Sequence, residues 1–251
     1  IKDAVKSGTG YIDALLFDDP KSWATSLADK SKQTSVSETV ITYSFSGISG
    51  STPLYSNGYG DEVTAGVHAF DDTHIAATRL ALNEFSNIAN LKFVEVLETG
   101  TTVGTMRFAF TDHDSVNDET GGLSWGWANG PYNQPIGGDI WVDSEHKAAD
   151  KNWDQGTSTN FHSLMHEIGH ALGLDHSFSG NDTLPTSRDF TNYTIMSYTN
   201  PSKDNYATDA WNEQEYMIST TPMVYDIAAL QYLYGTAVHN GGDTVYAYDP
   251  A

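Results

Sequence analysis

The sequence contains no cysteine, which excludes disulfide bonds, thiolate metal sites and cysteine nucleophiles. Histidine and the carboxylates therefore remain as the strong metal ligands. Basic residues are scarce as well, because 12 Lys and Arg stand against 33 Asp and Glu and give a formal net charge of −21. A surface this acidic repels nucleic acid and anionic membranes, so we expect neither as a partner.

Long apolar runs are also missing, since no stretch of about 18 apolar residues occurs and no segment is predicted to span a membrane. The 251 residues, 39% of them hydrophobic and 12% aromatic, suffice for one large domain or two closely joined subdomains with a sizeable core. No basic segment followed by an apolar stretch stands at Ile1. We therefore expect any targeting segment or pro-segment to have been removed or never included.

Predicted strands come first along the chain and predicted helices come later. Apolar alternation and β-branched or aromatic residues predict strands over 40–45, 91–97, 105–110, 123–128 and 139–142. Apolar residues at helical spacing predict three helices: one capped by Asp71 or Asp72, one over 159–172, and one from Pro222 to a stop at Gly235. This order predicts an α+β protein with no internal repeat.

The helix predicted over 159–172 carries the candidate functional residues. At about 100° per residue, His166 and His170 lie on one face and Glu167 lies beside that face. The roughly opposite face is apolar and consists of Phe161, Leu164, Ile168 and Leu172. Gly169 keeps the surface low, and Gly173 permits a turn with positive φ after which the chain can bring His176 back.

Three neutral imidazoles with an open fourth position are typical of a catalytic zinc site. Zinc lowers the pKa of its water to roughly 7, and Glu167 is placed to accept the water proton as a general base. The alternative is an inert, solvent-facing histidine pair. Five specified positions match by chance in only about 1 in 10⁴ chains of this length, which favours the metal site.

The segment 166–176, His-Glu-x-x-His-x-x-Gly-x-x-His, resembles the signature of the metzincin metalloproteases. A methionine turn follows that signature in the family, and Thr194-Ile195-Met196-Ser197-Tyr198 is similar to it. The resemblance implies the metzincin protease fold: a twisted, mainly parallel N-terminal sheet with two long helices that include the active-site helix, and a smaller irregular C-terminal subdomain ending in a helix. It also implies that Met196 packs beneath the metal without binding it.

Further segments resemble serralysin-type bacterial proteases, so that the resemblance covers nearly the whole chain. These segments are 10–16 with Trp23, 41–45, 226–235 and 242–246. The resemblance implies a secreted, monomeric zinc endopeptidase of proteins or peptides. One catalytic domain over 1–251 would comprise an upper subdomain, 1–173, and a lower subdomain, 174–251, which holds the third ligand, the methionine turn and the last helix.

The resemblance also implies roles for particular residues. His166, His170 and His176 bind the catalytic zinc, and Tyr198 is a further ligand that swings away to stabilise the oxyanion. The substrate backbone is expected to add as a strand along Ser124, Trp125, Gly126, Trp127 and Ala128.

Two departures from the serralysin pattern concern further metal ions. Serralysins continue into glycine-rich, calcium-binding repeats, whereas this sequence ends at Ala251 with only Gly241-Gly242-Asp243. We expect a catalytic-domain fragment or a relative without the repeats, so repeat-bound calcium is not implied. The segments 137–143 and 175–177 instead resemble matrixins, the sister family, which bind a structural zinc through a histidine where this chain has Trp141. That second zinc site is therefore not expected.

Several aromatic and polar residues have two interpretations. Asp139 and Asp143 are candidate calcium ligands, although two aspartates in a loop more often form turns. Trp125, Trp127 and Trp141 line the substrate cleft or cover the core. His162 approaches the metal or has a capping or solvated role, and His113 belongs to a second metal site or to a loop ion pair.

Two alternatives to an active endopeptidase remain open at this stage. One is a protease-like module that binds peptide or metal without turnover, which loss of Glu167 or of a ligand would have marked. The other is an enzyme that hydrolyses a non-peptide amide at the same zinc. Digestion of casein compared with a panel of small amides separates this last alternative from a peptidase.

Overall fold

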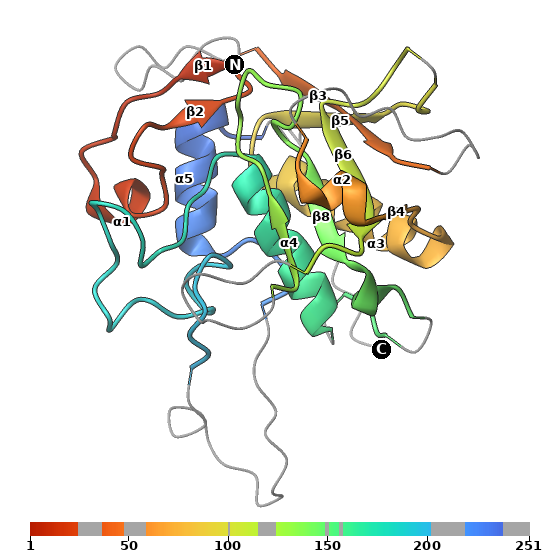
Figure 1. Ribbon diagram of the computed structural model, residues 1–251. Coiled ribbons are helices and arrows are strands. Elements are labelled where there is room, and N and C mark those ends of the chain that lie inside the picture. Colours follow the sequence, from red (N-terminus) through yellow and green to blue (C-terminus); the bar gives the residue numbers. More distant parts are fainter. Residues whose placement is uncertain are drawn as a thin grey trace, which may run out of the picture.

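A computed structural model describes the chain at 1–24, 37–47, 59–99, 101–114, 124–148, 151–155, 158–201 and 219–237 (Figure 1). The expected strand residue Leu123, the segment 242–246 and Gly241-Gly242-Asp243 lie outside these described residues. Within the described part, no helix has both the length and the apolar character that a membrane crossing requires.

A mixed, mainly parallel sheet forms the frame of the molecule. Its strands are β3 (Thr39–Phe45), β4 (Val67–His68), β5 (Leu91–Glu95), β6 (Met106–Thr111), β7 (Gly126–Ala128) and β8 (Ile140–Asp143). The main path follows the order β5-β3-β6-β8-β7, in which the first four strands are parallel and β7 pairs antiparallel with β8. β4 pairs antiparallel with β6. The predicted α+β class and mainly parallel sheet are therefore confirmed.

The central strands are buried on both faces, as parallel strands generally are. Every residue of β6 and β8 is buried. Phe108 and Phe110 of β6 pack against Phe70, with ring centroids 6.3 and 4.6 Å apart. This aromatic packing explains why the strand predicted from Met106, Phe108 and Phe110 lies at the centre of the sheet. The strand begins and ends one residue later than predicted.

Two long helices pack against each other and against the sheet. They are α3 (Asp72–Ile88) and α4 (Thr159–Ala171), and α4 contacts β7 and β8. Asp71 caps α3 by accepting from the backbone N–H groups of Thr73 and His74, which decides between the two predicted capping aspartates. Ser158 caps α4 by accepting from Phe161 N.

The last helix, α5 (Val224–Tyr234), begins later than predicted. Pro222 is not its first helical residue, because the N-cap is Met223. The Asp226 carboxylate accepts from Met223 N at 2.7 Å and fixes that start. The predicted stop is confirmed, since Gly235 ends the helix with φ of 83°.

Short elements complete the described chain: β1 (Lys2–Asp3) pairs with β2 (Lys21–Ser22), and α1 (Gly10–Asp13), α2 (Asp61–Ala65) and the 3₁₀ turn η1 (Ser144–Lys147) connect the larger elements. In Figure 1 the sheet lies on one side of α4, and α5 lies on the other. The N-terminal segment reaches the end of α4, where Trp23 Nε1 donates to Ala171 O at 2.8 Å. Leu16 and Leu174 form a β-bridge there. The N-terminal segment and the turn after α4 thus hold each other.

Candidate metal centre

The helix α4 presents its candidate functional residues as predicted. The apolar face of Phe161, Leu164, Ile168 and Leu172 is fully buried. His166 and Glu167 are also buried, with only 5% and 7% of their surface exposed. These two polar side chains therefore sit in the interior, where each needs a partner that compensates for lost water.

Gly169 allows the chain around Met196 to approach α4 closely. A Cβ at this position would lie 2.7 Å from Met196 Sδ, far inside van der Waals contact. Met196 itself is fully buried. The glycine of the motif thus makes room for the methionine that follows it by 27 positions, so both belong to one packed unit.

Gly173 produces the reversal that returns the chain to the helix. Its φ is 101°, a conformation that residues with a Cβ rarely adopt. Leu174 N donates back to Gly169 O at 3.0 Å and closes the turn. His176 follows two residues later and faces the two helical histidines.

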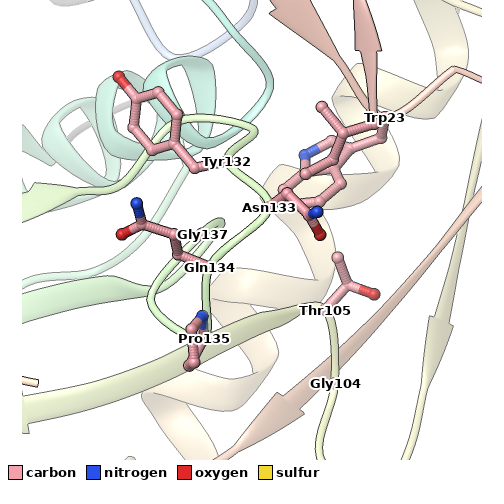
Figure 2. Close-up of a pocket in the computed structure, with 9 residues that line it drawn as sticks. Trp23, Gly104, Thr105, Tyr132, Asn133, Gln134, Pro135 and Gly137 are labelled. Atoms are coloured by element: carbon pink, nitrogen blue, oxygen red, sulfur yellow. The ribbon is translucent and has the colours of Figure 1, made fainter. Parts of the chain in front are cut away.

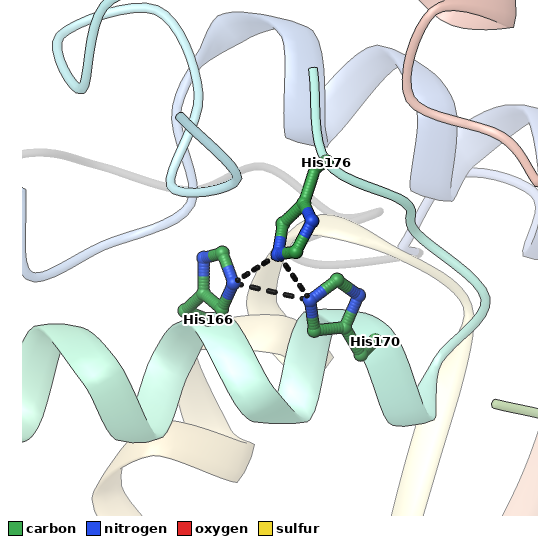
Figure 3. A group of neighbouring side chains, drawn as sticks. All are labelled: His166, His170 and His176. Carbon is green, nitrogen blue, oxygen red and sulfur yellow. Dashed lines mark hydrogen bonds between the residues drawn. The ribbon is translucent and has the colours of Figure 1, made fainter. Parts of the chain in front are cut away.

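The three imidazoles converge on one point, as Figure 3 shows. Their Nε2 atoms are separated by 3.1 Å (His166 to His170), 3.1 Å (His170 to His176) and 3.2 Å (His166 to His176). Three nitrogens at 2.0–2.1 Å from one tetrahedral zinc lie about 3.3 Å apart, so this spacing fits that ion. Among the described residues, the structure offers this one group of three or more candidate metal ligands.

The proton positions on His166 and His170 also favour a cation. Each Nδ1 contacts a backbone carbonyl oxygen, that of Ile195 at 2.7 Å and that of Leu174 at 2.8 Å. A carbonyl oxygen only accepts, so each Nδ1 carries the ring proton and each Nε2 presents a lone pair. Two such lone pairs facing each other at 3.1 Å repel unless a cation binds both.

Burial keeps these rings neutral. Desolvation, followed by the neighbouring imidazoles, holds the pKa of His166 well below its ordinary value. Desolvation and the nearby His176 lower the pKa of His170 to about 3. Neutral imidazole is the form of histidine that binds a metal, so both rings are ready as ligands near neutral pH.

Glu167 has an incomplete set of partners. Its Oε2 is buried and makes no hydrogen bond to any described residue. Burial raises the pKa of its carboxyl to about 8. Unpartnered buried oxygens are rare and mark places where water or an ion completes the structure. The site of Glu167, one residue after His166, is therefore arranged for a small bound species.

Tyr198 lies beside the triad. Its hydroxyl is 2.9 Å from His176 Nε2, and its ring centroid is 4.9 Å from that of His176 and 5.5 Å from that of His166. The residue is 42% exposed. A hydroxyl at this place can approach both a metal held by the triad and a group that reacts there.

A buried carboxylate supports the backbone under the triad. Asp226 of α5 is fully buried and accepts from Thr194 Oγ1 at 2.5 Å, Ile195 N at 2.9 Å and Met223 N at 2.7 Å. Burial raises the pKa of this carboxyl to about 6. Sequence spacing could not have shown this contact, because Asp226 and Ile195 are 31 positions apart.

The edge strand β7 contains Gly126, Trp127 and Ala128 of the expected substrate strand, and Ser124 and Trp125 precede it. In the part of the chain that the structure describes, no strand pairs with the outer edge of β7. Trp125 packs on Trp153 with ring centroids 5.4 Å apart and donates to Asn160 Oδ1, so this indole covers the core.

The other two tryptophans differ in exposure. Trp141 is 1% exposed and lies in the core of the sheet. Trp127 is half-buried, and its ring lies 5.7 Å from that of His113. Of the three tryptophans with two interpretations, Trp127 is thus the one whose position suits contact with a ligand.

The remaining polar candidates lie apart from the triad. The half-buried His162 donates from Nδ1 to Ser219 O at 2.7 Å, a backbone contact in the segment before α5. Asp112 forms an ion pair with His68 at 2.8 Å. The ion pair in this loop therefore involves His68, whereas the prediction named the neighbouring His113.

Asp139 and Asp143 cannot bind one ion together. They lie four residues apart at the two ends of β8, a distance of about 13 Å along a strand. Asp139 contacts the Tyr59 hydroxyl at 2.6 Å, and Asp143 accepts from Glu145 N at 2.8 Å. Each carboxylate therefore has its own protein partner.

A pocket of about 400 Å³ shares no lining residue with the triad (Figure 2). It is lined by Ile1, Trp23, Gly104, Thr105, Tyr132, Asn133, Gln134, Pro135 and Gly137. No charged side chain and none of the candidate site residues belongs to this lining.

Comparison with known proteins agrees with the geometry of the triad. The sequence profile of the matrixin family matches residues 64–206, which include His166, His170, His176 and the turn at Met196. The chain is 29% identical over 226 residues to serralysin of Proteus mirabilis, with 83% of this chain and 43% of that protein covered. It is 32% identical over 190 residues to serralysin A of Dickeya chrysanthemi, with 72% and 37% covered.

A third similar protein is the metallopeptidase AprA of Pseudomonas marginalis, 28% identical over 229 residues, with 83% of this chain and 43% of that protein covered. The chain thus spans less than half of the length of these relatives.

Proposed function

Because the chain belongs to the matrixin family of zinc metallopeptidases, we propose that it is a secreted zinc-dependent endopeptidase that hydrolyses peptide bonds of proteins. The convergence of three Nε2 atoms within 3.2 Å of one another carries this proposal, since it matches a zinc site and no other described group does. The relatives named serralysin and metallopeptidase support the same peptidase activity.

Each residue around the triad has a role in the proposed reaction. Zinc, when bound, supplies a Lewis acid that polarises the scissile carbonyl and acidifies water. Glu167 takes the proton of the attacking water and passes it to the leaving amine. Its burial favours this transfer, because no competing partner holds Oε2 and bulk water is largely excluded. Tyr198 donates its hydroxyl proton in a hydrogen bond to the developing oxyanion.

The substrate is expected to bind as an extra strand. The outer edge of β7 presents backbone donors and acceptors of Gly126, Trp127 and Ala128 to an extended peptide. Main-chain pairing of this kind orients the scissile bond without reading much side-chain sequence. We propose Ser124 and Trp125 as the start of this surface, although the Trp125 indole itself faces the core.

The two proposed subdomains supply different parts of the site. Residues 1–173 supply the sheet and α4, and residues 174–251 supply His176, Met196 and α5. We propose that the protein acts as a monomer on proteins or peptides, with one zinc ion and no nucleic acid or membrane partner. Calcium remains a candidate at Asp143, through oxygen ligands.

Zinc content measured beside casein hydrolysis tests the proposed function. We expect about one zinc per chain, activity that a chelator abolishes, and recovery when zinc is restored. Zinc without hydrolysis of casein or of small amides would instead indicate a silent peptide- or metal-binding module. Hydrolysis of small amides without casein would indicate a different amide hydrolase, and a chain that binds no zinc would contradict the proposal altogether.

A further inference from the structure

The three histidines of the triad lie on different parts of the fold. His166 and His170 belong to α4, and each donates from Nδ1 to a backbone carbonyl. His176 lies after the turn at Gly173, outside any helix or strand. A ligand on a loop keeps a fixed ring orientation only if its surroundings supply it, because χ1 and χ2 rotation is otherwise free.

The ring of Phe178 supplies a contact of this kind. It stacks on the imidazole of His176 with centroids 5.1 Å apart and an angle of only 6° between the planes. Ser177, between them, is fully buried, donates from Oγ to Asp189 at 2.5 Å and receives Leu184 N on its carbonyl. With Ser177 directed inward, the two rings emerge on the same outer side of the chain and meet.

The same phenyl ring contacts Tyr198. Their centroids are 5.0 Å apart with an angle of 59°, and the tyrosine ring is in turn 4.9 Å from that of His176. Phe178, His176 and Tyr198 thus form a closed triangle of rings. Tyr198 is 42% exposed, and the phenyl ring contacts it beside the metal site.

We propose that Phe178 is a positioning residue of the metal centre, which fixes the plane of His176 and supports Tyr198 where its hydroxyl meets Nε2. The inference rests on the proposed zinc site and adds a residue that the chemistry itself does not require. Aromatic stacking of this geometry is worth up to roughly tenfold in an equilibrium or a rate. Phe178 acts only through its neighbours and touches no reacting atom in the proposed reaction.

The rate of zinc release into excess chelator tests this role without relying on activity. We expect Phe178→Ala to release zinc roughly tenfold faster than the wild type, and Phe178→Leu, which keeps apolar bulk without a ring face, to release it several-fold faster. Phe178→Tyr restores the ring and is expected to return release to the wild-type rate. Unfolding temperatures of the zinc-free proteins show whether a variant has lost its fold, and the Leu and Tyr pair decides the outcome if the Ala variant has.

Phe17→Ala is the matched control. Phe17 is a half-buried phenylalanine whose ring lies 6.3 Å from that of His170, a ligand already held by Leu174 O. We expect its loss to leave zinc release unchanged. Equal release rates in the wild type, Phe178→Ala and Phe178→Leu would overturn the inference while leaving the zinc site intact. A wild-type chain without zinc would overturn the proposed function as well, so the two failures are distinguishable.

A double-mutant cycle tests the second half of the proposal. If Phe178 supports Tyr198, the effects of Phe178→Leu and Tyr198→Phe on zinc release are coupled, because the tyrosine hydroxyl is useful only while its ring is held in place. We expect the double variant to differ from the product of the single effects by a factor of roughly two or more. Independent effects would restrict the role of Phe178 to His176.

Discussion

His166 and Asp226 bind the two polar backbone groups of the same residue. Ile195 N donates to Asp226 Oδ2 at 2.9 Å, and Ile195 O accepts from His166 Nδ1 at 2.7 Å. The carboxylate of α5 is therefore two hydrogen bonds away from a candidate zinc ligand that lies 60 positions earlier in the chain. Outer contacts of this kind fix the tautomer and orientation of a metal-binding histidine.

We predict that Asp226→Ala destabilises the fold and weakens zinc binding together. The change leaves three donors without their acceptor, the buried Thr194 Oγ1 and Ile195 N and the half-buried Met223 N, which costs roughly 3 kcal/mol or more. Denaturant unfolding of the zinc-free protein measures the first effect, and competition with a chelator measures the second, expected at tenfold or more. The control is Val224→Ala, an exposed change in the same turn. Equal zinc affinity in Asp226→Ala and the control would show that the carboxylate does not contribute to zinc binding.

Sequence periodicity could predict the parts of the site that lie close together along the chain. His166, Glu167 and His170 share one helical turn, and the positive φ of Gly173 is a local property, so their arrangement follows from the 100° step of a helix. The support of the site is different. Ile195 contacts both Asp226 and His166 across the fold, and no spacing in the sequence marks these contacts.

Contacts across the fold also explain why the predicted ends of some elements were wrong. Pro222 has the fixed φ of a first helical residue, but the Asp226 carboxylate reaches back to Met223 N and sets the start of α5 two residues later. The order of the strands could not be predicted from the sequence either. The position of β8 between β6 and β7 depends on pairings that only the folded sheet defines.

We predict that Glu167→Gln retains zinc and loses turnover. Glutamine has nearly the same shape and replaces a buried carboxyl whose Oε2 has no partner in the described chain, so the fold should not suffer. It cannot accept a proton from water, and loss of a general base lowers the rate about 10²- to 10⁴-fold. Zinc content and casein hydrolysis are measured on the same sample. His170→Ala is the contrasting variant, expected to lose both, and activity retained in Glu167→Gln would remove the general-base assignment.

We predict that Tyr198→Phe lowers kcat more than it raises KM. The hydroxyl lies 2.9 Å from His176 Nε2, beside the place where negative charge develops on the scissile carbonyl. A hydrogen bond that strengthens in the transition state affects kcat, and its loss costs about 10- to 10³-fold. Steady-state kinetics on a defined peptide separate the two constants. A change in KM alone would mean that the hydroxyl binds substrate and does not stabilise the oxyanion.

The contacts of Tyr59 indicate which group donates in its hydrogen bond with the buried Asp139. The Tyr59 hydroxyl has a single proton, yet two acceptors lie within reach, Pro135 O at 2.7 Å and Asp139 Oδ2 at 2.6 Å. Both contacts are satisfied when the Asp139 carboxyl is protonated and donates to Tyr59, which then donates to Pro135 O. Burial raises the pKa of Asp139 to about 8, in agreement with a protonated group.

This geometry predicts a specific pH dependence of stability. In the unfolded chain the carboxyl of Asp139 titrates near pH 3.9, whereas in the folded chain it holds its proton until about pH 8. Unfolding between these values releases a proton, so the stabilising contribution is complete below about pH 4 and is lost as the pH rises through about 8. Asp139→Asn stays neutral and can still donate to Tyr59. Between pH 5 and pH 8 its unfolding free energy should therefore gain about 2 kcal/mol or more over that of the wild type. Urea unfolding at both pH values measures the gain, with the exposed change Asp154→Asn as the control. A constant difference between Asp139→Asn and the wild type would show that Asp139 is already ionised in the folded protein.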